Sequence, residues 1–247
     1  MTRVGTIAKR ELAAVFFSPI AYVVLFIYLL VMGILFSIFT FAPGNVTEVR
    51  RFFDLARFCL FFIIPPMTMS LIADEYRSGR IEMLRTSPLT EGDLVIGKYL
   101  GAMGFYVVLL AVTLVYVLLL AIFGRPDYGA VLSCYLGMLL LGMLFVSIGL
   151  FFSSVSQNQI VAFLATLLVL GVLTFVDVIS TNFAPASVSF WGMTLPIREP
   201  LNYLGVGTHV GDFLKGVVEI SNTVYFLSGS FLFLFMTYLT LESRKWR

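Results

Sequence analysis

The segment IAYVVLFIYLLVMGILFSIFTF, residues 20–41, carries no charged residue and is long enough to cross a lipid bilayer. A helix needs about 20 apolar residues to span a hydrocarbon core of about 30 Å. Five further apolar runs follow it. The predicted spans lie at about 20–42, 58–73, 94–123, 130–152, 160–179 and 223–241. The sequence therefore predicts an all-α integral membrane protein, with six transmembrane helices in a single domain, residues 1–247.

The composition of the whole chain agrees with a membrane location. Hydrophobic residues make up 60% of the 247 residues and charged residues only 12%, whereas soluble domains carry about 25% charged residues. A net charge of +2 gives no reason to expect nucleic acid as a partner. Cys59 and Cys134 lie in apolar runs, and the single histidine, His209, has no Cys/His set around it. We therefore expect no metal site and no disulfide framework.

Residues 1–19 mix apolar side chains with Arg3, Lys9, Arg10 and Glu11. This pattern predicts an amphipathic helix that lies in the membrane interface, although a short solvated leader is the alternative. Because charges persist to Glu11 and Pro19 follows soon after, the segment does not resemble a cleaved signal peptide. Pro19 would mark the elbow at which the chain turns into the first span.

An even number of spans places both termini on one side of the membrane. Ten Lys and Arg residues lie in the N-terminal segment, residues 74–98 and the C-terminal tail, against six in the opposite loops. Because positive charge accumulates on the cytoplasmic side, we expect both termini and the loop 74–93 in the cytoplasm. Residues 182–222 then form the longest outer segment, and their loose helical spacing predicts short re-entrant or interfacial helices.

Charge is concentrated in DEYRSGRIEMLRTSPLTEGDLVIGK, residues 74–98, which holds nine of the thirty charged residues. Within it, Ile81, Met83 and Leu84 would give a short helix one apolar edge. Such an edge favours a helix that docks on a partner protein. A solvated connecting loop is the alternative.

The stretch GDLVIGKY, residues 92–99, matches most of the phosphate-binding pattern G-x-x-x-x-G-K-[ST] but ends in Tyr99. Its bulky residues, and the absence of a preceding strand, argue against a phosphate-binding loop. We instead expect Lys98 to snorkel at a helix entrance.

With a single histidine the chain cannot form an H-E-x-x-H zinc site. The sequence contains no other catalytic set, so we expect a protein that is not an enzyme and binds no cofactor.

Two features inside the predicted spans are candidates for function. Asp177 is the one acidic residue within a span, and it is either a wetted helix end or a substrate or proton site. Pro65 and Pro66 remove two consecutive helical donors, so they form either a fixed kink or a hinge beside a transport path.

Residues 74–101 resemble the first intracellular loop of ABC-2-type exporter permeases. The matching residues are Glu75, Arg77, Ser78, Gly79, Glu82, Leu84, Pro88, Gly97 and Lys98. Arg80 departs from the threonine usual in the family. Further stretches, among them KRELAAVFFSPIAYVV, FFIIPPMTMSLIADE and SSVSQNQIVAF, are similar to the gliding-motility-associated subgroup of these permeases.

The resemblance implies the permease subunit of an exporter in the bacterial inner membrane. Such a subunit pairs with a second copy or a homologous permease and docks on a separate ATPase, which binds ATP and magnesium. The implied coupling residues are Glu75, Arg77, Gly79, Glu82, Leu84 and Pro88. A membrane-anchored outer auxiliary subunit is a further expected partner. Transport by alternating access is the expected function. The alternative is a mechanical transmitter that couples the ATPase to outer proteins without moving a substrate.

Overall fold

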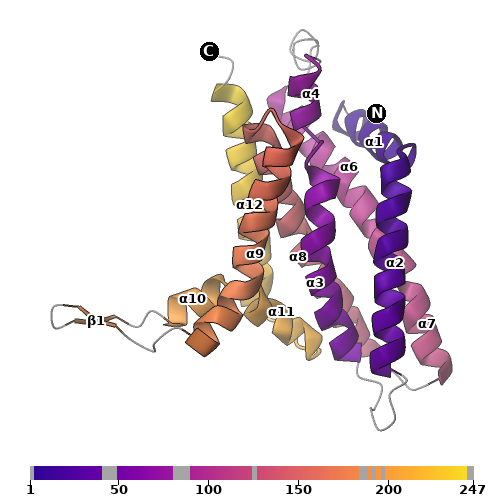
Figure 1. Cartoon of the computed structure of the whole chain (residues 1–247), viewed down its shortest axis with the longest axis vertical. Helices are drawn as coiled ribbons and strands as arrows, with labels where there is room; N and C mark the ends of the chain where they lie inside the picture. The colour runs from indigo at the N-terminus through magenta and orange to yellow at the C-terminus, as the bar shows by residue number, and fades with distance from the viewer. Residues whose placement is uncertain are drawn as a thin grey trace.

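The computed structural model describes residues 3–40, 49–79, 90–123, 127–183, 188–190, 193–195 and 198–243. Over these residues the protein is a bundle of long helices (Figure 1). Six helical segments are long and apolar enough to cross a membrane. They are Ala21–Ile38, Arg50–Arg77, Glu91–Ile122, Tyr128–Val155, Gln159–Ser180 and Ile220–Ser243. The predicted all-α fold with six spans is confirmed.

The helices follow one another in a simple order along the chain. They are α1 (Arg3–Phe16), α2 (Pro19–Thr40), α3 (Val49–Thr68), α4 (Ala73–Arg77), α6 (Glu91–Val112), α7 (Leu114–Phe123), α8 (Tyr128–Val155), α9 (Gln159–Phe183), α10 (Arg198–Leu204), α11 (Val206–Leu214) and α12 (Ile220–Ser243). In Figure 1 both chain ends lie at the same end of the bundle as α4.

Helix α8 forms the centre of the bundle. It packs against α3, α6, α9, α11 and α12, and 72% of its span is buried, more than in any other candidate span. Small residues let neighbours approach closely: the Tyr106 ring lies directly over Gly142, and its hydroxyl donates to the Met138 carbonyl at 2.5 Å. This contact fixes α6 against α8.

The outer faces of α2, α9 and α12 are apolar and exposed. Only 22% of each of these spans is buried. Large hydrophobic side chains such as Phe26 on α2, Leu168 on α9 and Phe231 on α12 are each more than 60% exposed. Apolar surface of this extent is costly in water and is the surface that a bilayer covers.

Helix α1 is seated on α6 and does not lie only on lipid. Gly97, Gly101 and Gly104 of α6 form a groove for it. A Cβ atom added at Gly97 would lie 2.6 Å from Ile7, and one added at Gly101 would lie 2.7 Å from the Glu11 Cβ atom. The predicted elbow follows, because α1 ends at Phe16 and α2 begins at Pro19, where proline suits the first turn of a helix.

The second span begins earlier than the sequence predicted. Helix α3 starts at Val49, not near residue 58, because its first turns carry charged residues that an apolar window misses. Arg57 is 6% exposed and pairs with Asp54 at 3.0 Å. It is therefore a buried helical residue, not a residue of the outer loop to which the charge count had assigned it.

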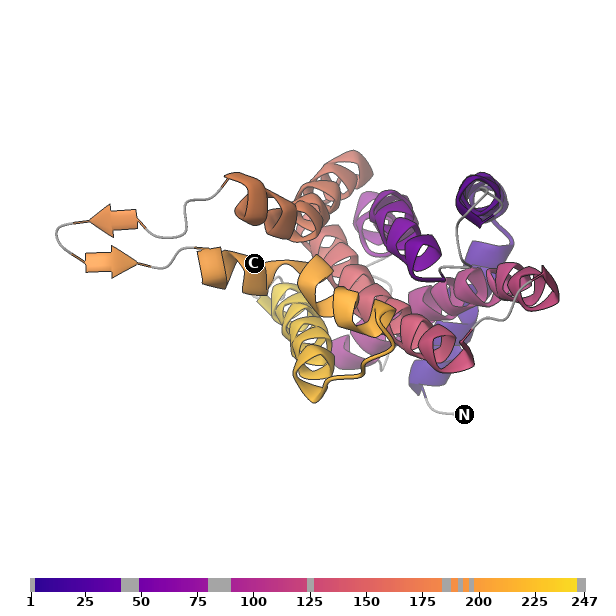
Figure 2. The ribbon, with the colours of Figure 1, turned by 90° about the horizontal axis from the view of Figure 1, so that it is seen from below.

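Residues 182–222, which the sequence predicts to be the outer segment, contain two short helices, α10 and α11, as the spacing predicts. They also contain an antiparallel hairpin of β1 (Val188–Phe190) and β2 (Met193–Leu195), in which Ser189 lies opposite Thr194. The hairpin was not predicted. It extends away from the bundle (Figures 1 and 2). How deeply the segment enters the membrane stays a prediction.

Candidate coupling site

The segment predicted to dock on an ATPase lies partly outside the described residues. Glu82, Leu84 and Pro88 fall within residues 80–89, which the structure does not describe. The described chain on either side forms the two anchors of this segment. The first anchor is α4 with residues 78–79, and the second is the start of α6.

The first anchor ends in a left-handed glycine. Gly79 has a φ of 68°, a conformation that costs other residues roughly 1–2 kcal/mol. A side chain there would meet no atom within 4 Å, so the backbone alone requires glycine. The Ser78 hydroxyl donates to the Asp74 carbonyl at 2.7 Å. Arg77, Ser78 and Gly79 are exposed, so α4 ends at the surface where residues 80–89 begin.

The second anchor is fixed by a capping box. The Asp93 backbone N–H donates to the Thr90 hydroxyl at 3.1 Å, and the Thr90 N–H donates back to the Asp93 carboxylate at 3.2 Å. This reciprocal arrangement satisfies two backbone donors that a helix start leaves open. Helix α6 therefore begins at a defined residue directly after the segment 80–89.

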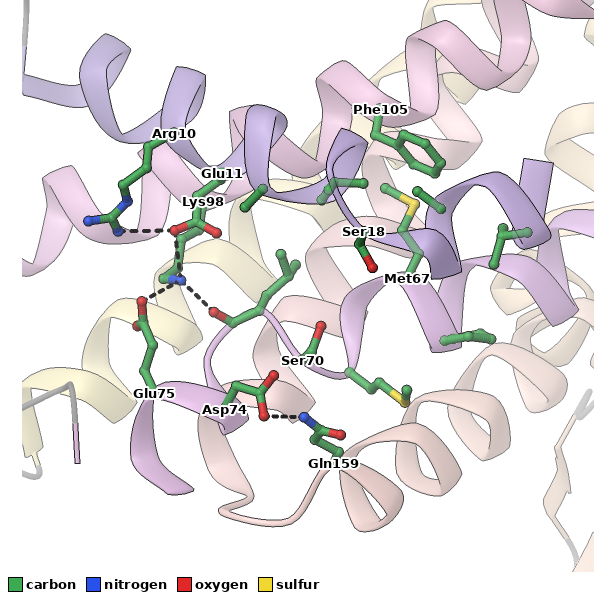
Figure 3. Close-up of a pocket in the computed structure, with 17 residues that line it drawn as sticks. Arg10, Glu11, Ser18, Met67, Ser70, Asp74, Glu75, Lys98, Phe105 and Gln159 are labelled. Carbon is green, nitrogen blue, oxygen red and sulfur yellow. Dashed lines mark hydrogen bonds and ion pairs between the residues drawn. The ribbon is translucent and has the colours of Figure 1, made fainter. Parts of the chain in front are cut away.

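A buried ion cluster joins the two anchors. The Lys98 ammonium on α6 lies 2.8 Å from the Glu75 carboxylate on α4 and 3.2 Å from the Glu11 carboxylate on α1. It also donates to the Leu71 carbonyl at 2.5 Å. Lys98 is only 1% exposed, so the prediction that it snorkels was wrong. Residues 92–99 lie within α6 and form a helix, not a phosphate-binding loop. Figure 3 shows the cluster.

The first anchor is also joined to α8 and α9. The backbone N–H groups of Ile72 and Ala73 both donate to the Ser153 hydroxyl of α8, at 3.0 and 3.1 Å. The Ser153 hydroxyl in turn donates to the Met69 carbonyl at 3.0 Å. The Gln159 amide of α9 donates to the Asp74 carboxylate. A displacement of α4 therefore acts on α1, α6, α8 and α9 together.

The structure separates the predicted coupling residues into two groups. Arg77 and Gly79 are exposed, whereas Glu75 is 8% exposed and faces the interior. Glu75 thus contacts the rest of the bundle through Lys98, and a direct contact with a partner stays a prediction. Sequence reasoning missed Glu11, Ser153 and Gln159 at this site. Glu11 could have been found from its position on the same helix face as Ile7. In the structure this face of α1 lies against the small residues of α6.

Pro65 and Pro66 stand in the last turn of α3 and near the middle of the candidate span Arg50–Arg77, as predicted. Directly after them, residues 69–72 form turns that separate α3 from α4. The Thr68 hydroxyl donates to the Ile64 carbonyl at 2.9 Å, and the Thr68 side chain is packed tightly against Gly149 of α8. The break in the helix is therefore placed between the bundle and α4. Its action as a hinge stays a prediction.

Asp177 of α9 lies beside Arg57 of α3, where α11 contacts both helices. An added Cβ atom at Gly207 of α11 would collide with both the Asp177 carboxylate and the Arg57 guanidinium, so the two charged groups meet at this glycine. The Arg57 guanidinium also lies 4.7 Å above the Phe58 ring. The sequence analysis singled out Asp177 but not Arg57 beside it, because Arg57 lies on α3, which is far from Asp177 in the sequence.

His209 belongs to a polar network that joins α11 to the start of α12. Its Nδ1 atom lies 2.6 Å from the Asn222 Oδ1 atom, and its ring stacks on Tyr225 at 4.0 Å. The Asn222 amide donates to the Asp212 carboxylate at 3.1 Å. Lys215 donates to the same carboxylate at 2.9 Å. This Lys215 hydrogen bond, followed by that from Asn222, lowers the pKa of Asp212. Among the described residues, no group of three or more His, Cys, Asp or Glu could hold a metal ion.

Comparison with known proteins identifies similar sequences. The family model described as "ABC-2 family transporter protein" matches residues 45–202. Two curated relatives are named "Probable multidrug ABC transporter permease YbhS", one from Escherichia coli strain K12 and one from Escherichia coli O157:H7. Each is 24% identical over 228 residues, which cover 83% of this chain and 57% of the relative. The chain therefore spans a little over half the length of these relatives.

Proposed function

The chain belongs to the ABC-2 family of transporter proteins, and from this premise we propose that it is the permease subunit of an exporter driven by a separate ATPase. One observation carries the proposal. The Lys98 cluster joins both anchors of the segment 80–89 to helix α1. Burying charges is costly unless they are paired, and this paired cluster fixes both ends of the segment 80–89 to the helices of the bundle, as the docking element of a partner ATPase requires.

The proposed mechanism follows from what α4 contacts. The ATPase binds residues 79–88 and displaces them when nucleotide closes it. Because Asp74, Glu75 and the backbone of residues 72–73 are bonded to other helices, the displacement reaches α1, α6, α8 and α9. The break after Pro66 lets α4 move against α3. The spans then rearrange around a path between this chain and a second permease subunit, by alternating access.

The proposed location is a bacterial inner membrane, with both termini in the cytoplasm. The two chain ends and α4 share one end of the bundle (Figure 1), which is also the end rich in Lys and Arg. Arg57 and Lys98 are buried in helices, so neither counts as a loop charge. When both are left out of the count of Lys and Arg, the side that holds the chain ends still has more of them. Single cysteines at Ser156 and Val217 should react with an impermeant reagent from opposite sides, Val217 from outside. Labelling of both from one side would overturn this topology.

The relatives are named multidrug permeases, which supports a small organic molecule as the exported substrate. Membership of the gliding-motility-associated subgroup rests on the sequence resemblance alone and is part of the proposal. We also propose an outer auxiliary subunit as a partner for α10, α11 and the hairpin.

Reconstitution tests the function directly. The permease is purified with the ATPase that co-purifies with it and placed in vesicles. ATP-dependent movement of solute across the membrane, lost when the ATPase is inactivated, is the expected result. Active ATP hydrolysis with no movement of any tested solute would instead assign the chain the role of a mechanical transmitter. Failure to co-purify any ATPase would overturn both.

A further inference from the structure

A cavity of about 620 Å³ opens beside the Lys98 cluster. It is bounded by α1, α2, the end of α3, α4, α6 and the start of α9. Cavities that hold small organic ligands measure about 300–1,000 Å³, so this one is large enough for such a ligand. Figure 3 shows charged side chains at one end and Met67 with Phe105 at the other. The two ends therefore differ in chemistry.

At the charged end, a hydrogen-bond acceptor is left over. The Lys98 ammonium has three donors and three partners, which are Glu11, Glu75 and the Leu71 carbonyl. The Oε2 atom of Glu75 is buried and has no hydrogen-bond partner among the described residues. Carboxylate oxygens only accept, so the group that the lining carboxylates of Asp74 and Glu75 can take is a donor; the Glu75 Oε2 atom itself is covered and is reached only if its side chain moves.

The charge at this end also favours a cation. Three carboxylates line the cavity, those of Glu11, Asp74 and Glu75, against two cations, Arg10 and Lys98. Arg10 is 56% exposed and pairs with Glu11 at 3.1 Å. Lys98 is fully engaged within the cluster. The balance of charge is therefore negative where a ligand would enter.

The opposite end is apolar and adaptable. Met67 and Phe105 line it (Figure 3), and the cavity lining also includes Ala14, Val15 and Val24. Methionine side chains fill irregular space and contact aromatic rings favourably, so this end suits a flat or branched apolar body. Ser18, at the elbow between α1 and α2, also lines the cavity.

We propose that the cavity binds an amphiphilic organic cation, with its charged group near Glu75 and Asp74 and its apolar body against Met67 and Phe105. The proposal deepens the transporter function by naming the class of substrate. It depends on that function only for the fate of the ligand, because binding needs neither ATP nor the ATPase.

Binding of tetraphenylphosphonium to the full-length permease in detergent micelles tests the proposal, measured by equilibrium dialysis with empty micelles subtracted. Tetraphenylborate has nearly the same shape and the opposite charge. We expect saturable binding of the cation and at least about tenfold weaker binding of the anion, the size of effect expected from one interaction with a charged group. Equal specific binding of both ions would overturn the proposal.

Two variants locate the site. Asp74→Asn should weaken binding of the cation about tenfold, and Met67→Trp should abolish it by filling the apolar end. Glu242→Gln, a carboxylate at the end of α12 that does not line the cavity, should change nothing. Unchanged binding in both Asp74→Asn and Met67→Trp, in samples whose thermal unfolding matches the unsubstituted protein, would also overturn the proposal.

Two further measurements separate the source and the fate of the ligand. Phosphatidylethanolamine, whose headgroup carries an ammonium, should compete with the probe if the natural ligand is a membrane lipid; competition by soluble amphiphilic cations alone would assign a soluble ligand. Either outcome supports the site. Cation binding without ATP-driven movement in vesicles would contradict the proposed transport function and leave the binding site standing.

Discussion

The Lys98 ammonium lies 2.8 Å from the Glu75 carboxylate, and both side chains are buried where α6 meets α4. The two residues stand on opposite sides of the segment 80–89 in the sequence. The pair therefore holds the two ends of this segment together, and the contact of Lys98 with Glu11 joins them to α1. The pair thus links α4 to α6 by a contact other than the segment itself.

Replacing Lys98 with alanine should destabilise the protein strongly. The change leaves the buried Glu75 carboxylate without its cation, whereas Glu11 keeps Arg10 as a partner; breaking a buried ion pair in this way costs about 3–5 kcal/mol. Thermal unfolding in detergent should show a large loss of stability. Lys215→Ala is the matched control, because Lys215 pairs with Asp212 but is 50% exposed and such pairs contribute about 0–1 kcal/mol. Equal losses in the two variants would contradict a special role for the buried cluster.

Gly101→Ala should loosen α1 from α6. The new Cβ atom would lie 2.7 Å from the Glu11 Cβ atom and 3.2 Å from the Ala8 carbonyl, so α1 must shift, at a cost of about 1–3 kcal/mol. Hydrogen exchange in residues 3–16 should rise. Gly104→Ala provides a graded control, because its nearest atom is the end of the flexible Leu12 side chain at 3.0 Å. If the two variants exchanged alike, the glycine groove would not hold α1 as described.

The six spans could be predicted because long apolar runs report directly on the bilayer. The first run, residues 20–41, coincides closely with α2, Pro19–Thr40. The contacts at the site could not be predicted in this way. Lys98 and Glu11 are 87 positions apart, and no local pattern states that α1 folds back onto α6. Glycines four positions apart, such as Gly97 and Gly101, permit close packing of membrane helices, but this spacing does not state which helix is the partner.

Charged residues inside helices were the main source of error in the sequence reading. Arg57 was counted as a residue of an outer loop because an apolar window ends where charge begins. In the structure α3 continues through it, and Asp54, Phe58 and the neighbouring Asp177 make its burial tolerable. Lys98 was misread for the same reason. A buried charge is stabilised by partners on other helices. The sequence pattern of one segment does not identify those partners.

Gly207→Ala should separate α11 from the Arg57 and Asp177 pair. A methyl group there collides with both charged side chains, so one element must move. We expect faster hydrogen exchange in residues 206–214 and weaker ATP-driven transport. Gly211→Ala, one turn along the same helix, meets no atom within 4 Å and should leave both unchanged or stabilise α11 slightly, since alanine favours helices over glycine by about 1 kcal/mol. Matching behaviour of the two would show that the pair does not hold α11.

Asp212 should make the outer segment sensitive to acid. Its pKa is lowered from 3.8, first by the hydrogen bond from Lys215, so its charged form is the one that stabilises the folded segment. A lowered pKa contributes stability that is present above pH 3.8 and is lost as pH falls through the folded-state value. The difference in thermal stability between the unsubstituted protein and Asp212→Asn should therefore close below pH 3.8. A difference that persisted unchanged in stronger acid would contradict this assignment.

The coupling role of the segment 79–88 is tested by substituting one charged and one apolar residue within it. If this segment docks on an ATPase, its binding energy should be concentrated in a few contacts, with Glu82 as the charge partner and Leu84 as the apolar anchor. Breaking a buried charge pair at an interface costs about 2–5 kcal/mol. Glu82→Arg and Leu84→Asp should therefore weaken association with the ATPase by more than tenfold, or uncouple hydrolysis from transport.

Both variants should reach the membrane at normal levels, because the anchors on either side hold the fold without residues 80–89. The Thr90 and Asp93 cap and the Lys98 cluster remain intact in each, so thermal stability should also be preserved. Glu91→Arg, in the first turn of α6, is the control and should reduce association much less. Co-purification and coupled hydrolysis are measured for all three. Full association and full coupling in every variant would identify the segment as a solvated connector, and Lys98 would then serve stability alone.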